Sequence, residues 1–213
     1  MAKTFDSLPE REALVDIARL FYLRGWMFGT AGNLSARART TPDSFWITAS
    51  GVPKGQLEES DLLRVSIGGG EVLEKISLDS KPSAETSIHQ AIYCSVPDVG
   101  ACLHVHSIAS HQVTNEVSEN ATELSLPNIE MLKGLGVWEE NPTVSLALFE
   151  NCLNVPTIAQ QIEQRFCHSP PRVPALLIRN HGVTVWGSSI QEAFNRIECI
   201  EFIFAFLAQR FCR

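Results

Sequence analysis

Apolar residues recur every three to four positions in two segments near the ends of the chain. Residues 11–24 and residues 189–210 both show this spacing, so each is predicted to form an amphipathic helix. Gly25 is expected to end the first helix, because glycine commonly follows the last helical residue. These two helices supply much of the apolar surface that a central sheet requires.

Two shorter helices are predicted in the middle of the chain. One covers residues 83–93, with Ser83 near its start and Glu85 in its first turn. The other begins at Ser107, whose hydroxyl can cap the first helical N–H groups, and runs to about Thr114. Both follow or precede segments with the pattern of strands.

Short apolar runs bounded by turn residues predict strands between these helices. The predicted strands are 45–48, 63–67, 71–73, 99–106, 175–180 and 183–186. Three consecutive glycines, 68–70, join the second strand to the third and predict a hairpin. A second tight connection joins the strands 175–180 and 183–186. Because of these two hairpins, we expect one α/β domain over residues 1–213, with a mixed, mostly antiparallel central sheet between helical layers.

Composition and charge exclude several classes of protein. Of 213 residues, 45% are hydrophobic and 19% charged, which is ordinary for a globular domain, and the net charge of −7 argues against nucleic acid as a partner. The longest apolar run, 202–207, is too short to span a membrane, and residues 1–10 do not have the pattern of a secretory signal. No C-x-x-C pair occurs among the six cysteines, so we expect reduced thiols and a cytoplasmic protein. The cysteines are Cys94, Cys102, Cys152, Cys167, Cys199 and Cys212.

Three histidines carry the candidate chemistry. His104 and His106 alternate on a predicted strand, so their side chains point to the same face and form half of a site for a divalent transition metal. His181 lies in the turn between the last two strands, where Gly182 leaves the backbone free to bend. Three histidines with one open position are typical of a catalytic zinc site rather than a structural one.

Other interpretations of the histidines stay open at this point. Two alternating histidines also occur as polar residues on a solvated sheet face, and the H-x-H pattern by itself is a weak signal. The other three, His89, His111 and His168, are expected at the surface or behind the ligands, because two lie on predicted helices and His168 lies in a proline-rich loop.

Five motifs occur in an order that resembles the class II (zinc-dependent) aldolase and adducin-head family. They are GTAGNLS at 29–35, ITASG at 47–51, KPSAET at 81–86, HVHS at 104–107 and RNHGV at 179–183. The resemblance implies a mostly antiparallel sheet between helical layers and one Zn²⁺ per subunit on His104, His106 and His181. It also implies a small sugar-phosphate substrate and a homotetramer with active sites near subunit interfaces.

Two further stretches, LPNIEMLKG at 126–134 and VTVWG at 183–187, resemble one branch of this family most closely. Its members are lyases of methionine salvage that remove water from a five-carbon ketose phosphate carrying a methylthio group. By this resemblance Glu130 is the acid and base that moves the protons. Glu85 is the second candidate, since it matches a glutamate beside the metal in aldolases, although a carboxylate in a helix first turn also complements the helix dipole.

The same resemblance implies a phosphate cradle built from three segments. Its residues are Gly32, Asn33, Ser50, Gly51, Ser83 and Ala84. Backbone N–H groups in glycine-rich turns and at a helix start suit an anion. Ala84 stands where many aldolases carry a second serine, so one hydroxyl is absent. Lys54 and Lys81 flank the segments and are expected on the solvated surface.

Two alternative functions remain open from the sequence. An aldolase or epimerase of the same fold acts on another pentulose or deoxyhexulose phosphate, and the segment around Glu130 is the feature that distinguishes it from the dehydratase. A non-enzymatic scaffold like the adducin head lacks the metal ligands. All three histidines are present here, which favours an enzyme.

Overall fold

A single twisted sheet forms the centre of the computed structural model, which describes residues 4–211. Its strand order is β4-β3-β2-β1-β5-β9-β8-β7-β6, and every described pair is antiparallel except β7 with β8. The predicted mixed, mostly antiparallel sheet is therefore confirmed. The strands are β1 (Asn33–Arg37), β2 (Ser44–Thr48), β3 (Leu62–Ser66), β4 (Val72–Lys75), β5 (Ala101–Val105), β6 (Glu123–Leu126), β7 (Val144–Phe149), β8 (Ala175–Ile178) and β9 (Gly182–Gly187).

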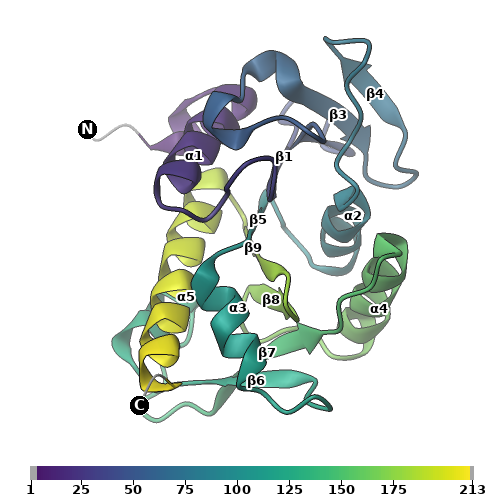
Figure 1. Ribbon diagram of the computed structural model, residues 1–213. Helices are drawn as coiled ribbons and strands as arrows, with labels where there is room; N and C mark the ends of the chain where they lie inside the picture. Colours follow the sequence, from purple (N-terminus) through teal and green to yellow (C-terminus); the bar gives the residue numbers. More distant parts are fainter. Residues whose placement is uncertain (1–3, 212–213) are drawn as a thin grey trace.

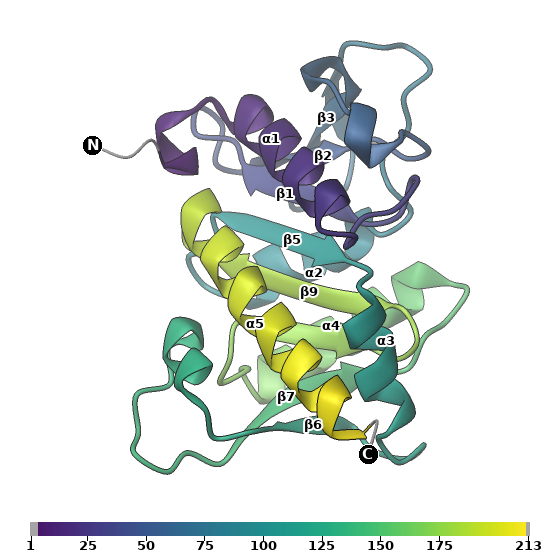
Figure 2. The same cartoon turned by 60° about the vertical axis from the view of Figure 1, so that its left-hand side comes forward.

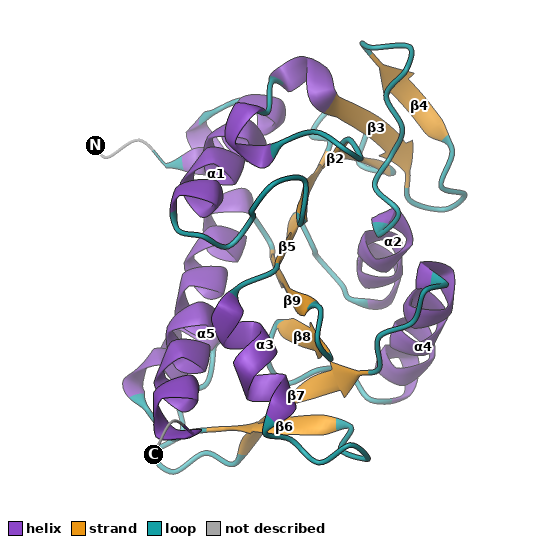
Figure 3. Cartoon of the chain, in the orientation of Figure 1, coloured by secondary structure: helices purple, strands orange, loops and turns teal. Residues whose placement is uncertain are grey.

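Helices cover both faces of this sheet (Figures 1 and 3). Helices α2 and α4 lie on one face, and α1, α3 and α5 lie on the other. The bounds are α1 (Glu10–Leu23), α2 (Thr86–Ser95), α3 (Ile108–Asn115), α4 (Val155–His168) and α5 (Ile190–Phe211), with short 3₁₀ turns η1 (Phe5–Ser7), η2 (Lys54–Gln56), η3 (Glu59–Asp61) and η4 (Glu130–Leu135). Two apolar cores result, one on each side of the sheet.

The central strands are buried on both faces. Every residue of β5, β8 and β9 is buried. Helix layers above and below explain why these strands are nearly continuous apolar runs in the sequence rather than alternating ones. Polar residues in such strands are exceptions to this pattern, and β5 carries His104.

Helix α2 begins three residues later than predicted, at Thr86 rather than residue 83. The reason is an isolated antiparallel bridge between Ala49 and Pro82, which keeps the chain extended where the helix was expected. Ser83 and Glu85 therefore lie outside the helix, with Glu85 at the N-cap position. The Ser107 cap is confirmed, since its hydroxyl accepts a hydrogen bond of 3.0 Å from the Ser110 N–H.

Four helices and strands were not assigned from the sequence: β1, β6, β7 and α4. His168, predicted in a loop, is the last residue of α4. The buried side of α4 carries Ile158, Ile162 and Phe166 at helical spacing, so the signal was present.

Two further features of the chain are its helix lengths and its cysteines. Within residues 4–211 no helix combines the length and apolarity that crossing a bilayer requires. Five cysteines are free thiols, namely Cys94, Cys102, Cys152, Cys167 and Cys199, and Cys212 lies outside the described residues.

Candidate metal centre

The candidate site begins with a row of polar residues across the three central strands. Asn33 on β1, His104 on β5 and Thr184 on β9 are directly opposite one another. Residues opposite each other in a sheet share a face, and these three face α2. His104 Nδ1 lies 2.9 Å from Thr184 Oγ1. A proton on Nδ1 donated to this hydroxyl leaves Nε2 with a free lone pair.

The other two histidines approach His104 from separate loops. His106 directly follows β5, and its backbone N–H donates to the Trp26 carbonyl at 2.9 Å. Its Nε2 lies 2.8 Å from the Nε2 of His104. The ring of His181 lies 5.1 Å from that of His104 and 4.6 Å from that of His106, centre to centre. The structure thus brings together the three imidazoles that the metal prediction requires.

The turn that carries His181 is held from the opposite side by α3 and the loop after it. Asn180 adopts a left-handed backbone (φ 50°), and its N–H donates to the Thr114 hydroxyl at 3.2 Å. The guanidinium of Arg179 donates to backbone carbonyls of the segment 114–121. These contacts fix the position of a ligand that sequence order places 75 residues after His106.

Glu85 is the fourth member of the cluster. Its Oε1 lies 2.9 Å from His181 Nε2, and its Oε2 lies 3.1 Å from His104 Nε2. The carboxylate makes no capping hydrogen bond to its own helix. The interpretation of Glu85 as a first-turn residue that serves the helix dipole is therefore wrong, because its side chain is turned toward the imidazoles.

Burial and charge set the protonation of this cluster. Burial lowers the pKa of His104 to about 4 and that of His106 to about 3, so both rings are neutral near pH 7. Burial alone would raise the pKa of Glu85, but the neighbouring His104 and His181 hold it well below its ordinary value. Neutral imidazoles beside an ionised carboxylate are the forms that bind a cation.

The donor set fits a divalent transition metal. One nitrogen or oxygen from each of Glu85, His104, His106 and His181 lies within 4.8 Å of the others. His181 Nδ1 is buried without a hydrogen-bond partner among the described residues. His104 is 1% exposed, so the interpretation of these histidines as polar groups on a solvated sheet face is wrong. Three imidazoles and a carboxylate suit zinc and its neighbours in the first transition row.

The residues predicted for the phosphate are brought together only in part. The antiparallel bridge between Ala49 and Pro82 joins the two segments, and the Ser50 N–H donates to the Lys81 carbonyl at 2.9 Å, so Ser83 and Ala84 continue on the other side of the bridge from Ser50 and Gly51. Ser50, Gly51 and Ala84 are exposed, whereas the expectation of a helix start at Ser83 is wrong. These two segments therefore lie side by side at the surface.

The glycine-rich segment differs more strongly from its prediction. Residues 29–35 were expected to offer the backbone N–H groups of a glycine-rich turn and the Asn33 amide, but the part from Gly32 onward is buried and β1 begins at Asn33. The amide of Asn33 is not free for a ligand, since it donates to Glu85 and lies against His89. A strand in the middle of the sheet leaves these side chains no access to solvent.

Lys54 is buried, contrary to its predicted place on the surface. Its side chain is covered by the two loops that flank it, and its Nζ donates to the carbonyls of Thr30 and Val52, both at 3.0 Å. Burial lowers the pKa of Lys54 to about 8, against the opposing effect of Glu85 and Asp61. Pro53 and Gly55 flank it in sequence, residues typical of an exposed turn, so nothing in the local pattern indicates a buried lysine. Lys81 is exposed as predicted.

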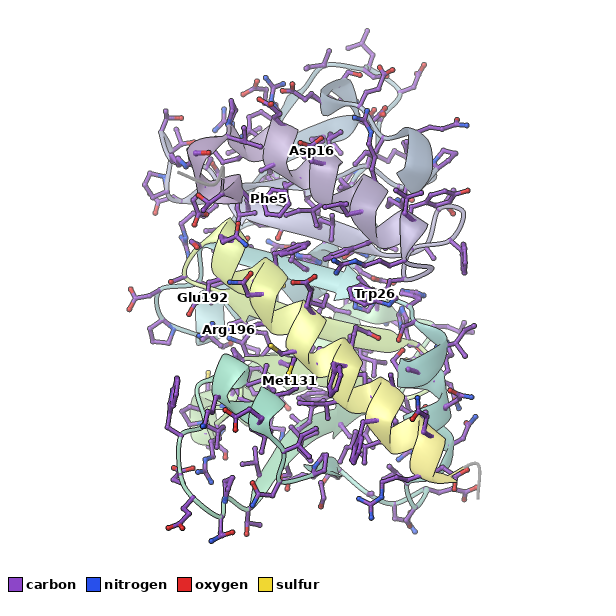
Figure 4. The ribbon with its side chains drawn as sticks, turned by 90° about the vertical axis from the view of Figure 1, so that its left-hand side faces the viewer. Phe5, Asp16, Trp26, Met131, Glu192 and Arg196 are labelled. Carbon is purple, nitrogen blue, oxygen red and sulfur yellow. The ribbon has the colours of Figure 1, made fainter. Side chains whose placement is uncertain are left out.

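Glu130 lies apart from the cluster within this chain. It is on η4, its side chain is 81% exposed, and its Oε1 accepts a hydrogen bond of 2.8 Å from Lys133. Figure 2 and Figure 4, in which Met131 marks η4, show η4 and α3 on opposite sides of α5. Helix α3 begins just after His106, so η4, which carries Glu130, lies across α5 from the segment that follows this histidine (Figure 2).

The remaining histidines separate into one buried and two peripheral residues. His89 on α2 is fully buried and contacts Asn33, whereas His168 is exposed and donates to the Gln164 carbonyl at 2.7 Å. His111 donates to the Ser107 carbonyl at 2.8 Å. His89 lies one helical turn after Glu85, and this spacing places both on the same side of α2. The spacing could have indicated that His89 lies near the cluster.

Comparison with known proteins agrees with this geometry. The model of the class II aldolase and adducin N-terminal domain matches residues 12–207. A methylthioribulose-1-phosphate dehydratase from Microcystis aeruginosa is 53% identical over 92% of this chain and 94% of its own. One from Leptospira biflexa is 44% identical over 96% and 99%. The structure of an L-fuculose 1-phosphate aldolase superposes with a TM-score of 0.75 at 21% identity, covering 96% of this chain and 88% of its own.

Proposed function

The chain belongs to the class II aldolase and adducin N-terminal domain family, and on this basis we propose that it is a methylthioribulose-1-phosphate dehydratase. The observation that carries the assignment is the 53% identity to such an enzyme over 92% of the chain. The reaction is the loss of water from 5-methylthioribulose 1-phosphate to give 5-methylthio-2,3-dioxopentyl phosphate. The activity is that of a hydro-lyase in methionine salvage.

We propose Zn²⁺, one per subunit, as the metal held by His104, His106 and His181. When bound, zinc acts as a Lewis acid that polarises the substrate carbonyl and acidifies the adjacent C–H group. The protein contributes rigid positioning of the ligands, through the β5–β9 pairing and the hydrogen bond between His104 and Thr184. The neutral state of the His104 and His106 rings favours metal binding over protonation at neutral pH.

The elimination requires a group that takes the C3 proton and returns a proton to the departing C4 hydroxyl. We propose Glu130 for this role, reaching the cluster of a neighbouring subunit in a homotetramer. Its high exposure and its place on the far side of α5 support action outside its own chain. Glu85 is the alternative acid and base, since within the described residues it is the carboxylate that contacts the imidazoles.

We propose that the substrate phosphate lies over the two adjacent exposed segments, at Ser50, Gly51, Ser83 and Ala84. Gly32 and Asn33 contribute through the path of the backbone, because the Asn33 amide is occupied by Glu85 and His89. The ammonium of Lys54 lies behind the loops 29–32 and 50–53 and adds positive charge on this side. Both the backbone N–H donors and this positive charge stabilise an anion bound there.

Turnover of methylthioribulose 1-phosphate and of fuculose 1-phosphate by the purified protein tests the function directly. We expect dehydration of the first and no cleavage of the second. Cleavage of fuculose 1-phosphate without dehydration would instead establish the aldolase alternative. Absence of both activities from protein that contains zinc would contradict the proposal.

Substitutions in the cluster test the assigned roles. His106→Ala should lose zinc and activity together, since two imidazoles bind the ion more weakly than three do. Glu130→Gln should keep zinc and lose about 10²–10⁴-fold in kcat, the range for one general acid or base. Zinc is measured by atomic emission, and Glu85→Gln is assayed beside both. A full loss of kcat in Glu85→Gln with normal turnover in Glu130→Gln would transfer the role to Glu85.

A further inference from the structure

A chain of buried hydrogen bonds extends from the metal cluster into the layer between the sheet and α2. Asn33 Nδ2 donates to Glu85 Oε2, and the carbonyl Oδ1 of the same amide meets His89 Nε2. On the other side of the ring, His89 Nδ1 lies 2.7 Å from the hydroxyl of Ser35. Tyr93 Oη lies 3.0 Å from that same hydroxyl. Five side chains are thereby joined in sequence.

The chemistry of the carboxylate fixes which group donates in each hydrogen bond of this series. An ionised carboxylate only accepts hydrogen bonds, so the amide must turn its NH₂ group toward Glu85. Its oxygen then faces His89, and a contact between these two atoms requires a proton on His89 Nε2. A neutral imidazole with that proton has an acceptor at Nδ1, which the Ser35 hydroxyl satisfies by donating to it.

The last hydrogen bond of the series, between Ser35 and Tyr93, is compatible with this assignment of donors. A serine hydroxyl that donates to His89 can still accept, and Tyr93 supplies the donor. His89 is fully buried, and burial lowers its pKa to about 4, so the neutral ring is the form present near pH 7. With a neutral ring, this arrangement satisfies Asn33, His89 and Ser35 while leaving Glu85 ionised. The Ser35 hydroxyl also lies 3.3 Å from the Cys102 carbonyl, a longer contact than its 2.7 Å to His89.

We propose that His89 is a positioning residue that locks the Asn33 amide with its NH₂ group toward Glu85 and so holds this carboxylate beside the metal centre. The proposal deepens the proposed function and rests on it for the activity readout. An asparagine amide without a partner on its oxygen can rotate by half a turn and present that oxygen to the carboxylate. His89 prevents this rotation, because its Nε2–H donates to the amide oxygen and would face the NH₂ group, another donor, if the amide turned.

The first test uses the tautomer of the histidine and does not depend on the reaction. Long-range ¹⁵N–¹H correlation spectra of the zinc-loaded protein, with ¹⁵N-histidine, should show His89 neutral and protonated at Nε2 at pH 7. His89→Gln identifies the signal by its loss. A ring protonated at Nδ1, or on both nitrogens, would overturn the proposal even if the enzyme proves to have another substrate.

The second test uses the donor itself. His89→Leu removes both ring nitrogens and should lower kcat about 10–100-fold, the usual range for groups behind the ligands, with little change in KM. His89→Gln places an amide N–H near the position of Nε2 and should recover most of kcat. Equal kcat in the two variants would show that the donor has no role, and so would a normal kcat in His89→Leu.

A control variant on the same helix distinguishes a loss of stability from a loss of positioning as the cause of a lower kcat. Ile92 lies on α2, is fully buried and carries no polar atom. Ile92→Ala should lower the melting temperature as His89→Leu does, but leave kcat unchanged. If Ile92→Ala lowers kcat as much as His89→Leu does at the same loss of stability, the effect of His89 is structural and the proposal fails. Should His89→Leu not fold, the tautomer and the kcat of His89→Gln still decide the outcome.

Discussion

At the scale of single residues, Glu201 carries a carboxyl group that the fold buries without giving both of its oxygens a partner. It lies on α5, is 3% exposed, and its Oε1 has no hydrogen-bond partner among the described residues. Burial raises the pKa of Glu201 to about 7, although a hydrogen bond from Ser107 opposes this effect. A buried carboxyl of this kind makes folding stability depend on pH.

We expect Glu201→Gln to stabilise the protein at pH 8 and to have much less effect at pH 5. The folded-state pKa of about 7 lies above the unfolded value near 4.5, so stability is lost as pH rises through 7. The glutamine removes this loss, which amounts to about 3 kcal/mol for the full shift. Urea unfolding at the two pH values measures it. Glu163→Gln, at an exposed position, is the control, and equal gains at both pH values would contradict the expectation.

Lys54 is the second buried charge, and it connects two loops. We expect Lys54→Met to raise KM for the phosphorylated substrate about tenfold, which corresponds to losing about 1.4 kcal/mol of attraction. Zinc content should not change, because Lys54 is outside the cluster. Faster amide exchange in residues 29–32 and 50–53 should accompany the change, since the carbonyls of Thr30 and Val52 lose their donor. Lys81→Met, at an exposed position, should alter neither KM nor exchange.

At the scale of elements, the approach of β1 to β5 depends on a glycine. Gly32 has a left-handed backbone (φ 77°), and a Cβ there would lie 2.8 Å from the carbonyl oxygen of His104. The strand that carries His104 thus passes so close to the preceding turn that a methyl group does not fit. Any residue with a side chain here must push β1 away from the metal centre.

We expect Gly32→Ala to cost clearly more stability than Gly29→Ala. Both positions have a left-handed backbone, so both substitutions carry a strain of about 1 kcal/mol. A Cβ at Gly29 meets nothing within 4 Å, so the difference between the two isolates the contacts that a Cβ at Gly32 makes with the His104 carbonyl and the Met27 side chain. Urea unfolding of the pair measures this difference, and equal losses would show that the strands can separate without cost.

At the scale of the whole molecule, the exposed apolar residues and the position of Glu130 both concern assembly. Phe28, Ile108, Trp138 and Phe202 are large apolar side chains that are more than half exposed. Such residues are expected at interfaces between subunits. A homotetramer would cover part of this surface and allow η4 of one subunit to approach the cluster of another.

Mixed tetramers test this arrangement. His106→Ala and Glu130→Gln subunits are each expected to be inactive alone, but a mixture refolded together should regain about one quarter of wild-type activity. This fraction follows because a working site needs His106 from one subunit and Glu130 from its neighbour, each present with a probability of about one half. Regain of activity would exclude action of Glu130 within its own chain.

The matched control combines His106→Ala with Glu85→Gln. His106 and Glu85 belong to the same chain's cluster, so exchanging subunits cannot restore a complete set of ligands. We expect no regain of activity in this mixture. Regain here together with none in the first mixture would reverse the roles proposed for the two glutamates.

The sequence by itself determined the main elements and the identity of the candidate ligands. Helical periodicity located α1 and α5, and the alternation around His104 and His106 predicted that their rings lie side by side. These features depend on local backbone geometry, which a short segment specifies without the rest of the chain. The five ordered motifs then indicated the family, because they sample the chain from one end to the other.

Only the tertiary structure decided the surroundings of these residues. Burial of Lys54 and His89, the turn of Glu85 away from its own helix, and the distance between Glu130 and the histidines all depend on contacts across 20 residues or more. Such contacts form when the helices pack on the sheet. The local pattern of polar residues is the same whether a side chain is exposed to solvent or buried beneath a loop. Solvent access, hydrogen-bond direction and charge at the site were therefore fixed by packing.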